Sequence, residues 1–211
     1  LFWPIFGALA VAHGKGVVHR DLKPGNLVLH RAAGRDVLDL LDFGIARSEV
    51  MGHSTTRDVV RGTPAYMAPE QLRAETCGPH TDVWALGVVL FEGLSGRLPH
   101  PGETAAECSA SILHPPAPSL HTLCPDLPIA ICVVIDRALA KQADARHADM
   151  PSFAHALHDA CVQGGIAAPA DPDPLGLPGW RDWKARAASG GSSTATSTAT
   201  GTAVSGATAV S

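Results

Sequence analysis

The chain has 211 residues and a formal net charge of −4, with 17% of its residues charged. This charge argues against a nucleic-acid-binding surface, because such surfaces are basic. The cysteines are odd in number and share no C-x-x-C spacing, which disfavours a disulfide framework or a zinc site. They are Cys77, Cys108, Cys124, Cys132 and Cys161. Reduced cysteines suit the cytoplasm, which is the compartment we expect.

The first residues, LFWPIFGALAVAHG, predict a helix over residues 1–14 that ends at Gly14 and Gly16. The same stretch also resembles the apolar part of a signal peptide, with a cleavage site at residues 10–12. No basic segment precedes it, and the apolar run is too short to span a membrane. We therefore prefer a helix that enters a folded domain, and we expect no membrane segment in this chain.

Three short strands are predicted next, at residues 17–18, 27–29 and 37–41, because apolar runs alternate there with polar loops. Residues 42–70 are rich in Gly, Ser and Thr and predict a long ordered loop. A loop of this length inside a domain is usually functional.

Helices dominate the remainder of the folded region. TDVWALGVVLFEGLSG is apolar on nearly every face, which predicts a buried central helix capped by Thr81 or Asp82. TAAE at residues 104–107 is a capping box that opens another helix. Two further helices are expected at 128–139 and 151–162. The predicted fold is therefore mainly α with a few short β-strands.

Composition divides the chain into three parts. Residues 1–163 form one predicted domain, large enough to bury a core. Residues 164–188 are rich in Pro and Asp and are typical of a linker. Residues 189–211 contain only Ser, Thr, Ala, Gly and Val, so little apolar burial offsets the entropy of ordering them. We expect that tail to be disordered.

Polar groups suited to phosphoryl transfer follow the first predicted helix. Asp21 and Asn26 share one loop, Lys23 lies between them, and Asp42 follows a predicted strand. Carboxylate and amide oxygens are ligands that Mg²⁺ prefers, and Asn26 with Asp42 supplies both. Asp21 is suited to orient a hydroxyl, and Lys23 to offset charge on a phosphate.

Four segments, HRDLKPGN, DFGIA, GTPAYMAPE and DVWALGVVLFE, occur in the order and spacing of the protein-kinase signature. The chain therefore resembles eukaryotic-like serine/threonine protein kinases, and GTPAYMAPEQL is most similar to the bacterial branch. The resemblance covers residues 1–161. It implies the large, C-terminal lobe of a kinase, with ATP and Mg²⁺ as cofactors and proteins as substrates.

The resemblance also implies residue roles. It makes Asp21 the catalytic base, Lys23 the phosphate contact, Asn26 and Asp42 the metal ligands, and Thr63 a bridge between Asp21 and Lys23. His19 would pack under Phe43, and Asp82 would brace the backbone of His19 and Arg20. Glu70 and Arg146 would form a buried ion pair, whose loss is costly.

Regulation would fall on the activation segment. Arg20 resembles the arginine that receives a phosphate there, and phosphorylation of Thr55 or Thr56 would supply it. The alternative is an unmodified hydrophilic loop. Two further histidines, His155 and His158, lie three residues apart on a predicted helix, and we interpret them as a solvated face rather than a metal site.

The chain lacks motifs of the kinase small lobe. No G-x-G-x-x-G pattern and no lysine on a V-A-I-K-like strand precedes the catalytic loop. Together with the absence of an initiating Met, this predicts that the chain is a truncated part of a longer serine/threonine kinase. The alternative is a lone, inactive kinase lobe that acts as a binding or regulatory module.

Overall fold

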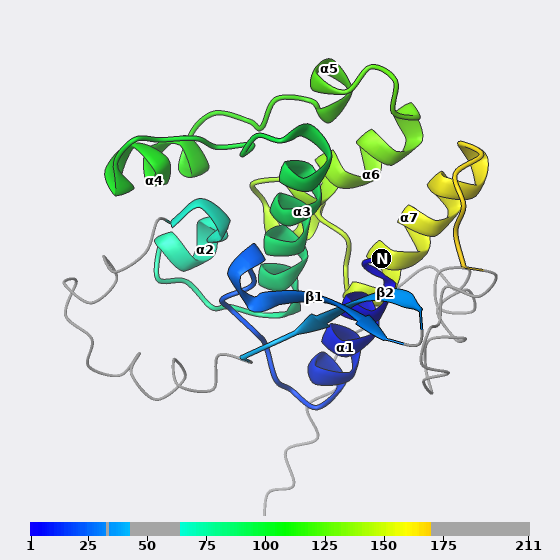
Figure 1. Ribbon diagram of the computed structural model, residues 1–211. Coiled ribbons are helices and arrows are strands. Elements are labelled where there is room, and N and C mark those ends of the chain that lie inside the picture. The colour runs from blue at the N-terminus through cyan, green and yellow to red at the C-terminus, as the bar shows by residue number, and fades with distance from the viewer. Residues whose placement is uncertain (33, 43–63, 170–211) are drawn as a thin grey trace, which may run out of the picture.

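The computed structural model describes residues 1–32, 34–42 and 64–169 (Figure 1). Its elements are α1 (Trp3–Gly14), η1 (Pro24–Asn26), β1 (Leu27–Ala32), β2 (Arg35–Leu40), η4 (Pro64–Tyr66), α2 (Pro69–Leu72), α3 (Pro79–Ser95), α4 (Ala105–Leu113), α5 (Leu120–Leu123), α6 (Ile129–Ala138), η5 (Ala143–Ala145) and α7 (Met150–Gln163). Over these ranges the protein is mainly helical with one two-stranded sheet, which confirms the predicted class at that level. The predicted divisions at residues 163 and 188 stay predictions.

Helix α3 lies at the centre of the fold and contacts α5, α6 and α7. Every residue from Thr81 to Phe91 is buried, as expected for a helix that is apolar on nearly all faces. The predicted cap is wrong, because the helix begins at Pro79 with Gly78 as its N-cap. Proline is favoured in the first turn, since its missing N–H has no helical partner there.

Helix α1 packs against α7, and its residues Ile5, Phe6 and Leu9 are buried in the core. The rings of Phe6 and Phe153 meet edge to face, with centroids 5.2 Å apart. This position agrees with the interpretation of α1 as part of a folded domain. No helix within the described residues is long and apolar enough to cross a membrane.

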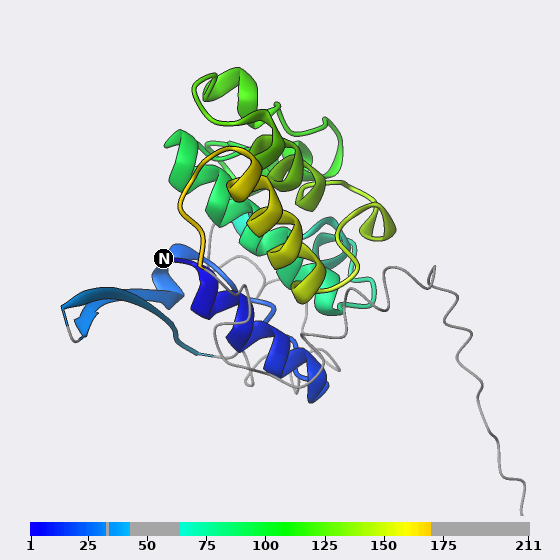
Figure 2. The same cartoon turned by 90° about the vertical axis from the view of Figure 1, so that its right-hand side faces the viewer.

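The sheet is a single antiparallel hairpin in which Leu27 pairs with Leu40. Figure 2 shows the hairpin reaching away from the helical body. The strand predicted at residues 17–18 is wrong: these residues are irregular, and the next residue, His19, directs its N–H to a side chain of α3. The predicted loop 42–70 is also interrupted, because η4 and α2 lie within its described end.

Two of the C-terminal helices, α4 and α7, begin at side-chain caps. Thr104 Oγ1 accepts a bond from Glu107 N (3.1 Å) and opens α4, while the Glu107 carboxylate accepts from Glu103 N. Asp149 Oδ1 accepts from Ser152 N (2.7 Å) and opens α7. The interpretation of His155 as solvated is wrong, because its ring faces the core and is only 5% exposed.

Candidate active site

The polar loop between α1 and β1 is held by two buried side chains. Leu22 is 1% exposed and belongs to the hydrophobic core, and His19 is fully buried. His19 Nδ1 accepts from Asp21 N (3.3 Å), and His19 Nε2 contacts Leu41 O (3.1 Å). The loop is thus fixed at its apolar positions, which leaves Asp21 and Lys23 partly exposed.

Asp21, Lys23 and Asn26 are brought together, as the sequence predicts. Lys23 Nζ lies 2.8 Å from Asp21 Oδ2, and Asn26 Nδ2 donates to Asp21 O (2.7 Å). Because the amide nitrogen of Asn26 is used in this way, its Oδ1 is the atom left for a ligand. Asp21 therefore sits between a cation and an amide, an arrangement that orients its carboxylate.

Asp42 follows β2 at the same end of the hairpin at which Asn26 precedes β1. Leu41 N donates to Asn26 O (2.8 Å), which ties the two segments together one residue before Asp42. Asp42 has φ of 51°, in the left-handed region that non-glycine residues rarely adopt, and its side chain is exposed. An amide oxygen and a carboxylate fit Mg²⁺, which takes the rest of its ligands from phosphate and water. No group of three or more His, Cys, Asp or Glu side chains in the described ranges could hold a metal ion.

Asp82 holds the backbone of the loop from α3. Its Oδ2 accepts from His19 N (2.8 Å) and its Oδ1 from Arg20 N (2.9 Å), and its side chain is fully buried. A third contact was not predicted: His13 Nε2, from the end of α1, lies 2.8 Å from Asp82 Oδ2. Arg20 has φ of 64°, so the carboxylate fixes a strained residue directly before Asp21.

Glu70 and Arg146 form a buried two-pronged ion pair, with both nitrogen–oxygen distances at 2.9 Å. Arg146 also donates to the carbonyl oxygens of His80 and Ala140, and Thr81 Oγ1 donates to Glu70 Oε1 (3.0 Å). Burial alone raises the pKa of Glu70, but the bonds and charge of Arg146 outweigh it and hold the pKa below its ordinary value. The pair fixes α2 to the helical body.

A stack of cationic and aromatic groups surrounds Trp84, and no sequence pattern predicted this cluster. His100 lies parallel to the Trp84 ring with centroids 5.7 Å apart, and Lys141 and Arg146 lie about 5 Å from that ring. Lys141 Nζ donates to His100 Nε2 (2.9 Å). Burial and the Lys141 charge lower the pKa of His100 to about 4, and burial lowers that of Lys141 to about 8.

Several predicted site residues lie outside the described ranges. They are Phe43, Thr55, Thr56 and Thr63. The phosphate-accepting role of Arg20 and the bridging role of Thr63 therefore stay predictions.

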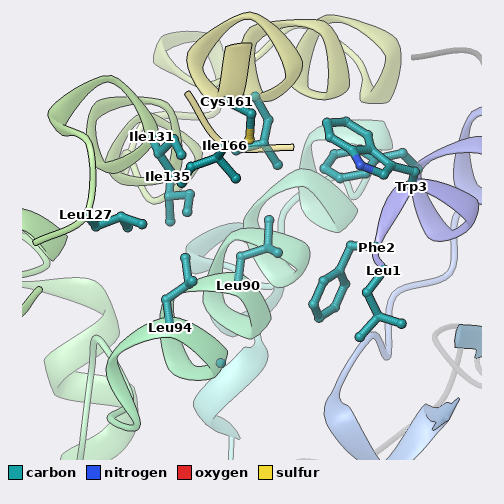
Figure 3. Close-up of a pocket in the computed structure, with 13 residues that line it drawn as sticks. Leu1, Phe2, Trp3, Leu90, Leu94, Leu127, Ile131, Ile135, Cys161 and Ile166 are labelled. Atoms are coloured by element: carbon teal, nitrogen blue, oxygen red, sulfur yellow. The ribbon is translucent and has the colours of Figure 1, made fainter. Parts of the chain in front are cut away.

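An apolar cavity of about 340 Å³ lies away from this polar loop. Figure 3 shows side chains of α1, α3, α6 and α7 directed toward it, with Trp3, Leu90 and Ile135 among them. Its lining carries no acid, base or amide side chain. Ile166, from the start of the predicted linker, closes part of its rim.

The loop, its brace from α3 and the buried Glu70–Arg146 pair place this chain in the protein kinase domain family, whose model matches residues 1–148. It belongs to the bacterial-type serine/threonine kinases. Over 184 residues it is 39% identical to serine/threonine-protein kinase Pkn1 of Myxococcus xanthus, covering 79% of this chain and 26% of that protein. Two further relatives are serine/threonine-protein kinases of Mycobacterium tuberculosis: PknJ at 39% identity (79% and 29% covered) and PknA at 36% (77% and 36%). The chain thus spans about a quarter to a third of these relatives.

Proposed function

We propose that this chain provides the catalytic loop and substrate-side lobe of a serine/threonine kinase that transfers the γ-phosphate of Mg-ATP to protein substrates. The observation that carries the proposal is the arrangement around Asp21, where Lys23 and Asn26 both contact the same residue at 2.7–2.8 Å. A partly exposed carboxylate with a lysine nitrogen 2.8 Å away suits the transfer of phosphate to a hydroxyl.

Each group has one part in this proposal. Asp21 accepts a hydrogen bond from the substrate hydroxyl and orients its oxygen toward the phosphate. Lys23 offsets negative charge on the transferred group, which is the main requirement of this reaction. Asn26 Oδ1 and Asp42 would hold Mg²⁺, whose charge neutralises the phosphate oxygens when it is bound. Thr63 is proposed to bridge Asp21 and Lys23, and phosphorylation of Thr55 or Thr56 to pair with Arg20.

We further propose that transfer requires a nucleotide-covering small lobe in addition to residues 1–211. The support is twofold: no Gly-rich loop or strand lysine occurs in the sequence, and the hairpin exposes apolar side chains. Val28 and Leu29 are 41% and 58% exposed, and Leu41, just beyond β2, is 44% exposed. Val28 and Leu29 are adjacent in β1 and project from opposite faces of the hairpin, so both faces offer apolar side chains for another structural unit to cover.

The experiment is phosphate transfer by the full-length gene product carrying Asp21→Asn, with Asp126→Asn, at an exposed position between α5 and α6, as the matched control. We expect Asp21→Asn to abolish transfer while nucleotide binding persists, and the control to act like the wild type. Near-normal transfer by Asp21→Asn would contradict the role of the base.

The exposed hairpin also favours a second function, a lone lobe that binds and regulates another protein. That alternative predicts a native product of 21.8 kDa, the mass of this chain, which binds a partner but turns over no ATP. The intact mass of the native product and an ATP-turnover assay on the same sample separate the two functions.

A further inference from the structure

The side chain of Gln71 joins α2 to the catalytic loop through two hydrogen bonds of opposite sense. Its Oε1 accepts from Ala68 N (2.9 Å), within the first turn of α2. Its Nε2 donates to Arg20 O (2.8 Å), 51 residues earlier in the sequence. One amide therefore links the helix that carries Glu70 to the residue that precedes Asp21.

The bonded carbonyl belongs to a strained residue. Arg20 has φ of 64°, and a conformation of this kind persists only where its surroundings hold it. Its N–H is held by Asp82 from α3, and its carbonyl is held by Gln71 from α2. Both backbone polar groups of Arg20 thus depend on side chains from other elements.

The carbonyl of Arg20 and the N–H of Asp21 belong to one planar peptide group. A bond that fixes the direction of the carbonyl therefore fixes the opposite direction of the Asp21 N–H, which points to His19 Nδ1 (3.3 Å). Gln71 in this way controls the orientation of the backbone from which the Asp21 carboxylate projects.

We propose that Gln71 is a positioning residue for Asp21. Through its two hydrogen bonds, Gln71 makes the orientation of Asp21, the proposed catalytic base, depend on the position of α2. This inference rests on the proposed kinase function. A plain capping role is the competing explanation, because the bond from Ala68 N also satisfies a free N–H at the start of α2.

Two variants separate these roles. Gln71→Glu keeps an acceptor for Ala68 N but turns a carboxylate oxygen toward Arg20 O, whereas Gln71→Lys keeps a donor and loses the acceptor. Positioning predicts that Gln71→Glu lowers kcat about tenfold to a hundredfold with little change in the KM for ATP. It also predicts that the kcat of Gln71→Lys falls far less, because the lysine still donates to Arg20 O. Capping predicts equal kcat for both and a lower midpoint of unfolding for Gln71→Lys alone.

Transfer is measured on the full-length gene product, with Gln163→Glu and Gln163→Lys on the exposed last turn of α7 as matched charge controls. Amide hydrogen exchange of residues 1–211 provides a readout that needs no activity. Positioning predicts that the Asp21 amide exchanges faster in Gln71→Glu than in the wild type. The Ala68 amide should exchange faster only in Gln71→Lys, because only that variant lacks the acceptor for Ala68 N.

The outcomes separate failure of the inference from failure of the proposed function. An active wild type whose kcat and Asp21 exchange are unchanged in Gln71→Glu overturns the positioning role and leaves the kinase function intact. A wild-type product that transfers no phosphate overturns both, whatever the exchange rates show.

Discussion

Arg146 reaches across 76 residues of sequence to bind both carboxylate oxygens of Glu70, and neither side chain is more than 7% exposed. The pair is the main polar link between the body of the domain and α2. Breaking a buried pair is costly because the remaining charge has no partner, whereas an apolar pair of similar volume is tolerated.

Arg146→Met should therefore destabilise the chain by about 3–5 kcal/mol, since Glu70 would remain buried and charged. The double variant Glu70→Leu with Arg146→Met should recover a large part of this loss. Urea denaturation of all four forms of the double-mutant cycle at pH 7 gives the coupling energy. A loss below about 1 kcal/mol in Arg146→Met would mean that the pair contributes no more to stability than a surface ion pair does.

Because His100 is buried in the stack on Trp84, the stability of the protein should depend on pH between about 4 and 6.5. The pKa of His100 is lowered from 6.5 to about 4, so between these values the unfolded chain binds a proton that the folded chain does not. The free energy of unfolding should therefore rise with pH from about 4 to 6.5, by up to about 1.4 kcal/mol per pH unit from this group.

The variant His100→Phe keeps an aromatic ring for stacking and removes the titration. The difference in unfolding free energy between wild type and this variant should increase with pH up to 6.5 and then level off. His114→Gln, at an exposed histidine, is the control. A difference that is flat from pH 4 to 6.5 would show that His100 titrates alike in both states.

The hydrogen bonds that Asp82 accepts predict that the conservative substitution Asp82→Asn lowers the stability of the protein. Asp82→Asn replaces one carboxylate oxygen by an NH₂ group, so either His19 N or Arg20 N loses its acceptor. An unsatisfied buried N–H costs on the order of 1–3 kcal/mol. Urea denaturation should show this loss, and the exposed Asp126→Asn should change stability by less than about 0.5 kcal/mol.

Asp149 provides a test of local structure at α7. Asp149→Ala removes the acceptor for Ser152 N and should cost about 1 kcal/mol of stability, while Asp149→Ser should restore most of it. Thermal denaturation measures both changes. An equal loss in the serine variant would indicate that the charge of Asp149, rather than its capping bond, stabilises the helix.

The sequence allowed prediction where a pattern is local. The apolar run of α3 and the two C-terminal helices follow from hydrophobic periodicity, and the cap at Thr104 follows from its spacing to Glu107. The cluster of Asp21, Lys23 and Asn26 lies within six residues, so its assembly needed only one loop.

Contacts between distant segments could not be predicted from periodicity. His13 and Gln71 bond to partners 69 and 51 residues away, and nothing in their immediate neighbours distinguishes them from surface residues. The solvated face predicted for His155 rests on the lack of neighbouring metal ligands in the sequence, which says nothing of the tertiary packing that buries this residue. Helix α3 begins before the predicted caps, Thr81 and Asp82, because Gly78 serves as its N-cap and Pro79 is favoured in a first turn.

The apolar cavity affects how this protein should be studied. Leu1, Leu94 and Ile166 at its rim are 40–55% exposed, so the apolar mouth of the cavity faces the solvent in the folded state. The dye ANS binds exposed apolar surface and is used to detect molten states. Its fluorescence should therefore already increase in the presence of the native protein. Melting curves followed with such a dye will begin from a bright baseline, and calorimetry is the better choice for comparing variants.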